Sequence, residues 1–145
     1  MQCHEIMKRD THVVADIDDV FVAARKMRQF DIGFLPVCDR AGHVVGVLTD
    51  RDVVLRVCAE DAPPRTTAVR DVMTTGVVTC RPTQSIALAE RKMRSRRVTR
   101  LPIVDDVGRL LGVLSLSEIS QYVRPARAGR TLRVVAERKY APERP

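Results

Sequence analysis

The chain has 145 residues, which is enough for one ordinary domain or for two small units that share a core. Apolar residues make up 45% and charged residues 30%, so the chain can bury a core without a disulfide or a metal. Trp is absent and aromatic residues make up 3%, which argues against the stacking platforms of single-strand nucleic-acid binders. No apolar run approaches the length of a membrane span, and the N-terminal residues lack the order of a signal peptide. We therefore expect a cytoplasmic protein.

The net charge of +7 is concentrated near the C-terminus. Residues 124–145 hold seven basic and two acidic side chains, a net +5, whereas residues 1–123 carry only +2. A basic tail alone is a poor indication of nucleic-acid binding. We therefore expect the tail to be the only part of the chain suited to nucleic acid, and we do not favour that function.

The four cysteines form no C-x-x-C pair and no spacing typical of zinc. Reduced, mostly inert thiols are the favoured interpretation, and Cys38 lies in an apolar strand-like run where a thiol behaves as a small hydrophobe. A metal site at Cys3 and His4 is the weaker alternative. The sequence holds no glycine-rich phosphate loop, no G-x-S-x-G elbow and no H-E-x-x-H motif. We therefore predict neither an enzyme nor a bound metal.

An internal repeat recurs at a constant offset of 66 residues without gaps. Three strings match almost letter for letter: residues 25–28 with 91–94, 35–37 with 101–103, and 46–48 with 112–114. Met7 matches Met73 at the same offset. Chance does not hold register over such a length, so the sequence is a duplication.

Each copy is predicted to fold in the order βαββα, giving a mixed α/β (α+β) protein. In the first copy we expect an extended segment at 12–14, a helix with apolar residues at 20, 23, 27 and 30, strands at 34–38 and 44–48, and a helix at 50–58. In the second copy the corresponding segments are 77–79, a helix from 86, strands at 101–104 and 110–114, and a helix at 116–123. Residues rich in helix-starting types precede each first helix: Asp16, Asp18 and Asp19, then Pro82, Thr83 and Ser85.

The division of the chain follows from these segments. Repeat 1 spans 1–58, a linker with Pro63-Pro64 spans 59–70, repeat 2 spans 71–123, and a basic tail spans 124–145. One copy alone leaves a sheet face bare. We therefore expect the two copies to pack sheet to sheet with pseudo-twofold symmetry.

The strongest local motif is Thr49 followed by Asp52, directly after a strand. This spacing predicts a capping box, in which each residue satisfies a backbone N–H of the other. The same helix start can also bind a phosphate, and a carboxylate can accept from both hydroxyls of a ribose. Ser115 and Glu118 repeat the box with a longer acidic side chain.

Arg100 directly precedes the second Leu-Pro strand, where the first copy has Phe34. Its guanidinium suits a phosphate. A solvated charge at a strand edge explains the residue equally well, because several other arginines lie nearby in the sequence.

The ordered strings Leu-Pro-Val/Ile, Asp-x-x-Gly and Gly-Val-Leu-Thr/Ser-x-x-Asp/Glu resemble the cystathionine-β-synthase (CBS) domain, twice, over about residues 6–123. This resemblance implies a Bateman module, a pair of CBS repeats that commonly dimerises into a flat disc. Such modules bind AMP, ADP, ATP or S-adenosylmethionine in clefts between the two sheets. They usually serve as regulators, for example in energy sensing.

The resemblance also assigns roles to individual residues. Thr49 and Ser115 would contact phosphate or ribose, Asp52 would contact the ribose hydroxyls, and Glu118 departs from the family's Asp. The residues implied against the adenine are Val13, Val14, Thr79 and Cys80, and Arg100 would hold phosphate.

Three functions follow as hypotheses. The first is a non-enzymatic regulator that binds an adenosine-containing ligand and signals to an unknown partner. The second is a constitutive interaction or dimerisation module with vestigial nucleotide clefts. The third is a nucleic-acid protein that uses the tail. We also expect a homodimer, because a lone module would leave apolar residues such as Met27, Phe30 and Met93 partly uncovered.

Overall fold

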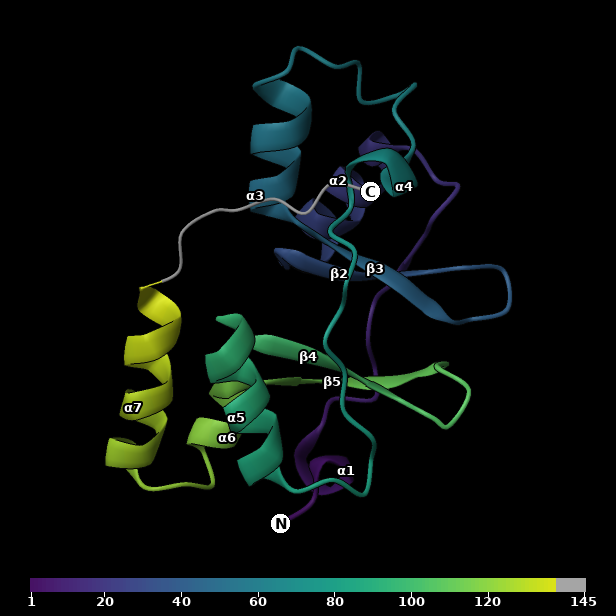
Figure 1. Ribbon diagram of the computed structural model, residues 1–145. Coiled ribbons are helices and arrows are strands. Elements are labelled where there is room, and N and C mark those ends of the chain that lie inside the picture. Colours follow the sequence, from purple (N-terminus) through teal and green to yellow (C-terminus); the bar gives the residue numbers. More distant parts are fainter. Residues whose placement is uncertain (138–145) are drawn as a thin grey trace. The chain divides into compact units, whose positions relative to one another are not determined.

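The computed structural model describes residues 1–137 and divides them into two compact units. The first-repeat unit is His12–Val77. Within the described residues, the second-repeat unit combines Met1–Thr11 with residues 78–137. Each unit holds its own small sheet and its own helices (Figure 1). The fold is therefore mixed α/β and built from two tandem repeats, as the sequence predicts.

The first-repeat unit contains a three-stranded sheet in the order β1-β2-β3. Its elements are β1 (Val14–Ala15), α2 (Val20–Phe30), β2 (Phe34–Cys38), β3 (Val44–Thr49), α3 (Asp50–Val53), η1 (Val54–Cys58) and α4 (Val69–Val72). Strand β1 runs parallel to β2, and β2 pairs antiparallel with β3. The predicted second helix is present, but it continues beyond α3 as the π-helix η1.

The second-repeat unit contains the two-stranded sheet β4-β5. Its elements are α1 (Cys3–Ile6), α5 (Ile86–Arg96), β4 (Arg100–Val104), β5 (Leu110–Ser115), α6 (Leu116–Ser120) and α7 (Pro125–Ala136). Cys80 forms a single parallel bridge to Ile103, at the place that β1 occupies in the other unit. Helix α6 ends three residues before the predicted limit at 123.

The first helix of each repeat begins at a residue that the sequence marks as a helix start. Asp19 accepts a hydrogen bond from the Val22 amide at 2.9 Å, and Ser85 accepts one from the Leu88 amide at 3.2 Å. Both helices end at a left-handed residue, Asp31 and Arg97. A left-handed cap satisfies the last carbonyls and turns the chain sharply toward the following strand.

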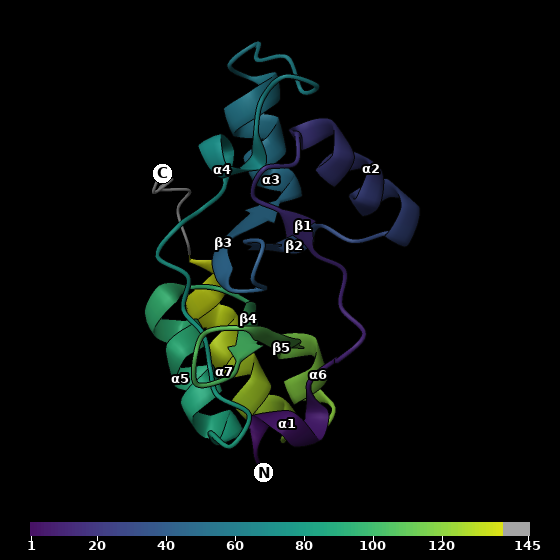
Figure 2. The same ribbon diagram turned by 90° about the vertical axis from the view of Figure 1, so that its right-hand side faces the viewer.

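Each repeat begins with a short lead-in segment, residues 5–8 in the first and 71–74 in the second. Each lead-in segment packs in the unit of the other repeat. The Lys8 and Val113 backbones exchange two hydrogen bonds of 2.9 Å, and Thr74 and Val47 exchange two of 2.8 and 3.0 Å. Figure 2 shows α1, drawn in purple, among the green elements of the second repeat. Each compact unit therefore contains the lead-in segment of the other repeat.

Each lead-in segment packs closely against a glycine of a neighbouring strand. A Cβ at Gly112 would lie 2.6 Å from the Lys8 carbonyl oxygen and 3.1 Å from the Met7 sulfur. A Cβ at Gly46 would overlap the Met73 side chain. These close approaches explain why both copies have glycine at this position of the strand.

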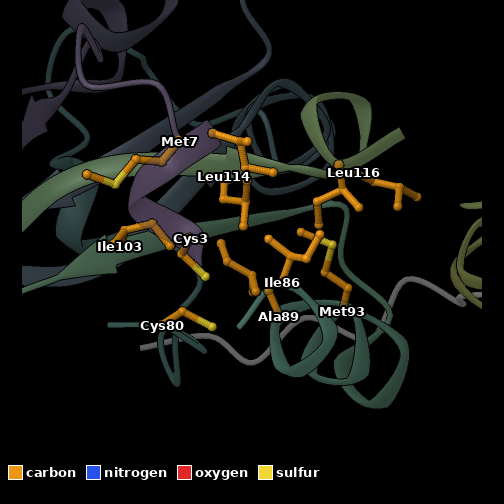
Figure 3. Close-up of a cluster of buried hydrophobic side chains, with 12 residues drawn as sticks. Cys3, Met7, Cys80, Ile86, Ala89, Met93, Ile103, Leu114 and Leu116 are labelled. Atoms are coloured by element: carbon orange, nitrogen blue, oxygen red, sulfur yellow. The ribbon is translucent and has the colours of Figure 1, made fainter. Parts of the chain in front are cut away.

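Each unit has its own apolar core, and the core of the second-repeat unit is drawn in Figure 3. Met93 is fully buried there, and Met27 is buried in the first-repeat unit. The expectation that both methionines are partly uncovered is therefore wrong, because each one fills the core of its own repeat. Phe30 is partly exposed, and its ring stacks on His12 at 3.6 Å between centroids.

Residues 125–136 of the predicted basic tail form helix α7, which packs on α5 and α6. Arg127 Nε donates to the buried Glu90 carboxylate at 2.7 Å, and Arg94 donates to the Thr131 hydroxyl at 2.9 Å. Val135, a residue of α7, is buried. The start of the tail thus belongs to the second-repeat unit, and its remaining residues, 138–145, lie outside the described part of the chain.

Candidate functional site

The structure contains the capping box predicted at Thr49 and Asp52. The Asp52 amide donates to Thr49 Oγ1 at 3.1 Å, and the Thr49 amide donates to Asp52 Oδ2 at 3.0 Å. Thr49 is the last residue of β3 and directly precedes α3, so the sheet as well as the helix holds the cap in place. The carboxylate and the hydroxyl are therefore fixed side by side.

The Asp52 carboxylate has further partners inside its unit, and its side chain is only 5% exposed. Thr74 Oγ1 donates to Asp52 Oδ2 at 3.4 Å, and Arg56 Nε lies 3.9 Å from Asp52 Oδ1. Arg56 is itself held by hydrogen bonds of 2.8 Å to the Val72 carbonyl and 3.0 Å to the Met73 carbonyl. The contact from Thr74 is long for a hydroxyl donor and therefore weak.

In the second capping box, the carboxylate of Glu118 has more donors than a cap alone provides. The Ser115 amide donates to Glu118 Oε2 at 3.0 Å, the Ser115 hydroxyl donates to the same oxygen, and Lys8 Nζ lies 3.1 Å from Glu118 Oε1. Burial alone would raise the pKa of Glu118, but the hydrogen bonds from Ser115 and Lys8 and the charge of Lys8 outweigh it and lower this pKa. Both carboxylate oxygens of Glu118 already have donors.

Thr74 and Lys8 occupy equivalent positions of the repeat, and the sequence analysis does not identify either of them. Each follows the matched methionine of a lead-in segment, Met73 or Met7, by one residue. Each contacts the acidic residue of the capping box in its unit. The matched methionines Met7 and Met73 are the sequence signal that could have identified Lys8 and Thr74. The residue after each methionine must lie beside the equivalent strand of its unit.

The segments predicted to face an adenine are fixed by lysines. Lys26 Nζ donates to the Val13 carbonyl at 2.7 Å, and Lys92 Nζ donates to the Thr79 carbonyl at 2.6 Å. Both lysines belong to the repeated basic string in the first helix of each copy. They hold the backbone of these segments in place on the sheet.

The side chains of these segments differ in exposure. Val14 pairs with Val37 and is fully buried, and Cys80 is buried beside Ile103. Val13 and Thr79 are partly exposed. The side chains of Val13 and Thr79 are therefore accessible without a change in the core, whereas those of Val14 and Cys80 are not.

Arg100 is the first residue of β4 and lies opposite Ser115 in the register of the sheet. Phe34 has the equivalent place opposite Thr49. The cation is therefore on the same strand pair as the second capping box, and its side chain is exposed. This pairing places the Arg100 guanidinium and the Ser115 hydroxyl on neighbouring residues of the two strands.

The predicted site residues fall into two groups. Val13, Val14, Thr49 and Asp52 lie in the first-repeat unit, and Thr79, Cys80, Arg100, Ser115 and Glu118 lie in the second-repeat unit. Two hollows of about 640 and 550 Å³ flank α7, and none of these residues lines either of them. Among residues 1–137 no three His, Cys, Asp or Glu side chains are grouped to hold a metal, and no helix is long and apolar enough to cross a membrane.

A duplicated βαββα unit with a hydroxyl–acid capping box at the end of each hairpin defines the class of the protein. The CBS domain family matches the chain twice, over residues 3–58 and 69–125. The chain therefore belongs to the CBS-domain family.

Known proteins resemble the chain in sequence and in structure. An uncharacterized protein of Methanopyrus kandleri is 30% identical over 117 residues, which cover 81% of this chain and 60% of that relative. A conserved CBS-domain protein of unknown function from Thermoplasma acidophilum has a TM-score of 0.84 at 24% identity, covering 97% of this chain and 79% of that one. The CBS domain pair of protein MJ0100, solved with 5′-methylthioadenosine and S-adenosylmethionine, has a TM-score of 0.74 at 22% identity, covering 83% and 94%. The two structures share the fold of this chain.

Proposed function

We propose that this chain is a cytoplasmic, non-enzymatic regulator that binds an adenosine-containing ligand at its capping boxes and signals to a partner protein. The observation that carries the proposal is the capping box at Asp52, whose carboxylate has one weak hydroxyl donor that a ribose can replace. The complex of the MJ0100 domain pair with two adenosine compounds supports the same class of ligand.

Each unit has its own groups for such a ligand. In the first-repeat unit Asp52 accepts from the ribose hydroxyls, Thr49 donates to ribose or phosphate, and the partly exposed Val13 contacts the adenine. In the second-repeat unit Arg100 with Ser115 holds phosphate, and the partly exposed Thr79 contacts the adenine. Glu118 contributes less than Asp52, because Lys8 and Ser115 already occupy its oxygens.

A thermal-shift panel tests the proposal. AMP, ADP, ATP and S-adenosylmethionine are compared at millimolar concentration, with the guanosine nucleotides as controls for the base. A ligand that prefers the folded state must raise the melting temperature. Arg100→Gln identifies the ligand class, since it weakens AMP or ATP but leaves the cationic S-adenosylmethionine unaffected. If no adenosine compound shifts the midpoint, the proposal fails.

The second candidate function is a constitutive interaction module. The observation that favours it is the burial of Asp52, whose oxygens all have partners within the unit. In such a module Thr74 and Arg56 would keep the carboxylate permanently occupied. The panel above separates the two functions, because the interaction module predicts no shift with any nucleotide.

A further inference from the structure

Two buried cysteines meet in the core of the second-repeat unit. Cys3 lies on α1 and Cys80 on the segment that bridges to β4, and their side chains are 0% and 1% exposed. Their side chains are hydrogen bonded to each other, and Figure 3 shows the two sulfur atoms side by side. Both are free thiols.

The environment makes the two thiols unequal. The hydrogen bond from Cys3, opposed by burial but assisted by the charge of Lys92, lowers the pKa of Cys80 to about 7. The same hydrogen bond, together with burial, raises the pKa of Cys3. Lys92 donates to the Thr79 carbonyl beside Cys80, so its charge favours the thiolate of Cys80. Thiolates are the sulfur species that react with oxidants. Cys3 keeps its proton, and its sulfur lies 3.9 Å from the Ser85 carbonyl oxygen.

We propose that Cys3 and Cys80 form a redox couple that peroxides oxidise to a reversible disulfide. Cys80 sulfur attacks one oxygen of hydrogen peroxide, the O–O bond breaks, and hydroxide leaves and is protonated to water. Cys3 sulfur then attacks the resulting sulfenic acid, the S–O bond breaks, and a second water leaves with the proton of Cys3. The two thiols lose two electrons in total, which reduce one peroxide to two waters.

The oxidant reaches the pair when α1 opens, and the charge of Lys92 on α5 then still favours the Cys80 thiolate. This helix has only four residues, and a helix of that length is not stable alone. Hydrogen bonds from the Cys3 amide to the Gln84 carbonyl at 2.8 Å and from the His4 amide to the Pro82 carbonyl at 2.9 Å hold it in place. A single helical turn opens locally at a lower free-energy cost than the longer core helices do. Reclosing returns Cys3 to Cys80 and favours the second step.

The disulfide would fasten α1 to the core of the second-repeat unit. Met7 and Lys8 follow α1 directly, and they hold Gly112 of β5 and the Glu118 carboxylate. Oxidation therefore restrains the segment that contacts the second capping box. This consequence does not depend on which ligand, if any, binds there.

Peptide mapping after peroxide treatment tests the couple. The protein carries Cys58→Ser, because Cys58 is exposed and would cross-link separate molecules. It is treated with hydrogen peroxide at neutral pH in the folded state, quenched with acid, alkylated in denaturant and digested with trypsin, which separates the remaining cysteines. We expect the peptides of Cys3 and Cys80 to be joined by a bond that dithiothreitol cleaves. We expect Cys38 to be alkylated, because it is a buried thiol whose pKa burial raises.

Two results would overturn the proposal. One is full alkylation of Cys3 and Cys80 after the treatment. The other is a cross-link that appears only when peroxide is added in denaturant, since the folded state would then contribute nothing.

Matched variants locate the reactive sulfur. In Cys3→Ser we expect peroxide to carry Cys80 to the sulfinic acid, because the resolving thiol is absent. Lys92→Met retains both cysteines, and it should slow disulfide formation about threefold or more by removing the charge that favours the thiolate. An unchanged rate in Lys92→Met would contradict the assignment of Cys80 as the attacking sulfur. Deuterium exchange provides a further readout, with slower exchange at the Met7 and Lys8 amides in the oxidised protein.

Discussion

At the scale of single residues, the carboxylate of Asp52 has three kinds of partner. It accepts from the Thr49 amide, it has a weak bond from Thr74, and it lies near the buried guanidinium of Arg56. A capping residue on the surface has only the first of these. Asp52 therefore contributes to the fold through electrostatics as well as through the helix cap.

The variant Asp52→Asn measures that contribution. A weakened cap alone would reduce the free energy of unfolding by roughly 0.5–1 kcal/mol. Removing the charge next to buried Arg56 adds to this loss, and we expect about 2 kcal/mol in total. Urea unfolding of Asp52→Asn beside the parent protein measures the difference. A loss no greater than that of Glu118→Gln, whose acid faces the exposed Lys8, would show that the contact with Arg56 contributes nothing.

The pH dependence of alkylation is a second prediction at this scale. The groups that face Cys80 are the Cys3 thiol on α1 and the Lys92 ammonium on α5, and the neighbour on β4 is apolar Ile103. Because the pKa of Cys80 is lowered to about 7, its thiolate forms at lower pH than that of an ordinary cysteine. The alkylation rate of Cys80 should therefore reach half its maximum at a lower pH than that of Cys38.

Mass-spectrometric alkylation rates between pH 5 and pH 10 give this profile residue by residue. Cys38 serves as the internal comparison, since burial and the nearby Asp39 and Asp16 raise its pKa. Lys92→Met should move the Cys80 midpoint upward. A Cys80 midpoint that coincides with that of Cys38 would refute the assignment.

At the scale of elements, the two lead-in segments close the hairpins through glycine. Gly112→Ala would place a Cβ 2.6 Å from the Lys8 carbonyl oxygen, which is backbone and cannot rotate away. We expect a loss of about 1–3 kcal/mol in unfolding free energy, the usual cost of overpacking. Gly129→Ala is the matched control, because its Cβ meets nothing within 4 Å and it lies inside α7. It should stabilise the protein by roughly 0.5–1 kcal/mol.

Thermal or urea unfolding of the two variants gives the comparison directly. Equal effects of both substitutions on stability would mean that the lead-in segment does not pack on β5 as described.

The sequence predicts the elements well because their signals are local. Asp19, Ser85, Thr49 and Ser115 all cap the helices that they were predicted to start, since capping depends on residues only three positions away. The repeat offset also predicts equivalent strands in both copies.

Other features depend on contacts between distant residues, and the sequence does not predict them. The exchange of lead-in segments leaves the offset of 66 unchanged, so the repeat alone cannot show which unit receives which segment. Arg127 lies in the predicted basic tail, yet it pairs with Glu90, which is buried on α5. The meeting of Cys3 with Cys80 is hidden for the same reason.

At the scale of the whole molecule, we expect a symmetric dimer. Its apolar contacts cannot be Met27 and Met93, which are buried. The first-repeat unit instead exposes Phe30 at 38% on α2 and Val54 at 55% on η1. Closed twofold assembly is the commonest way to cover such surfaces.

Light scattering at micromolar concentration should give twice the mass of the chain. Val54→Ser should shift the protein toward the monomer, whereas Val107→Ser, an exposed valine in the β4–β5 turn, should not. A monomeric parent protein would rule out the dimer.

We propose that the capping box of the first repeat binds the ribose of an adenosine compound. Isothermal titration of the tightest ligand from the thermal panel into the parent protein, Asp52→Asn and Glu118→Gln tests it most directly. Losing a charged hydrogen-bonding partner should weaken binding to Asp52→Asn by about 1.5–3 kcal/mol, which is at least tenfold in affinity. Glu118→Gln should change the affinity less, since its carboxylate is already occupied by Ser115 and Lys8. An unchanged affinity in Asp52→Asn, with only its stability reduced, would show that the motif is a helix cap and would contradict the proposed site.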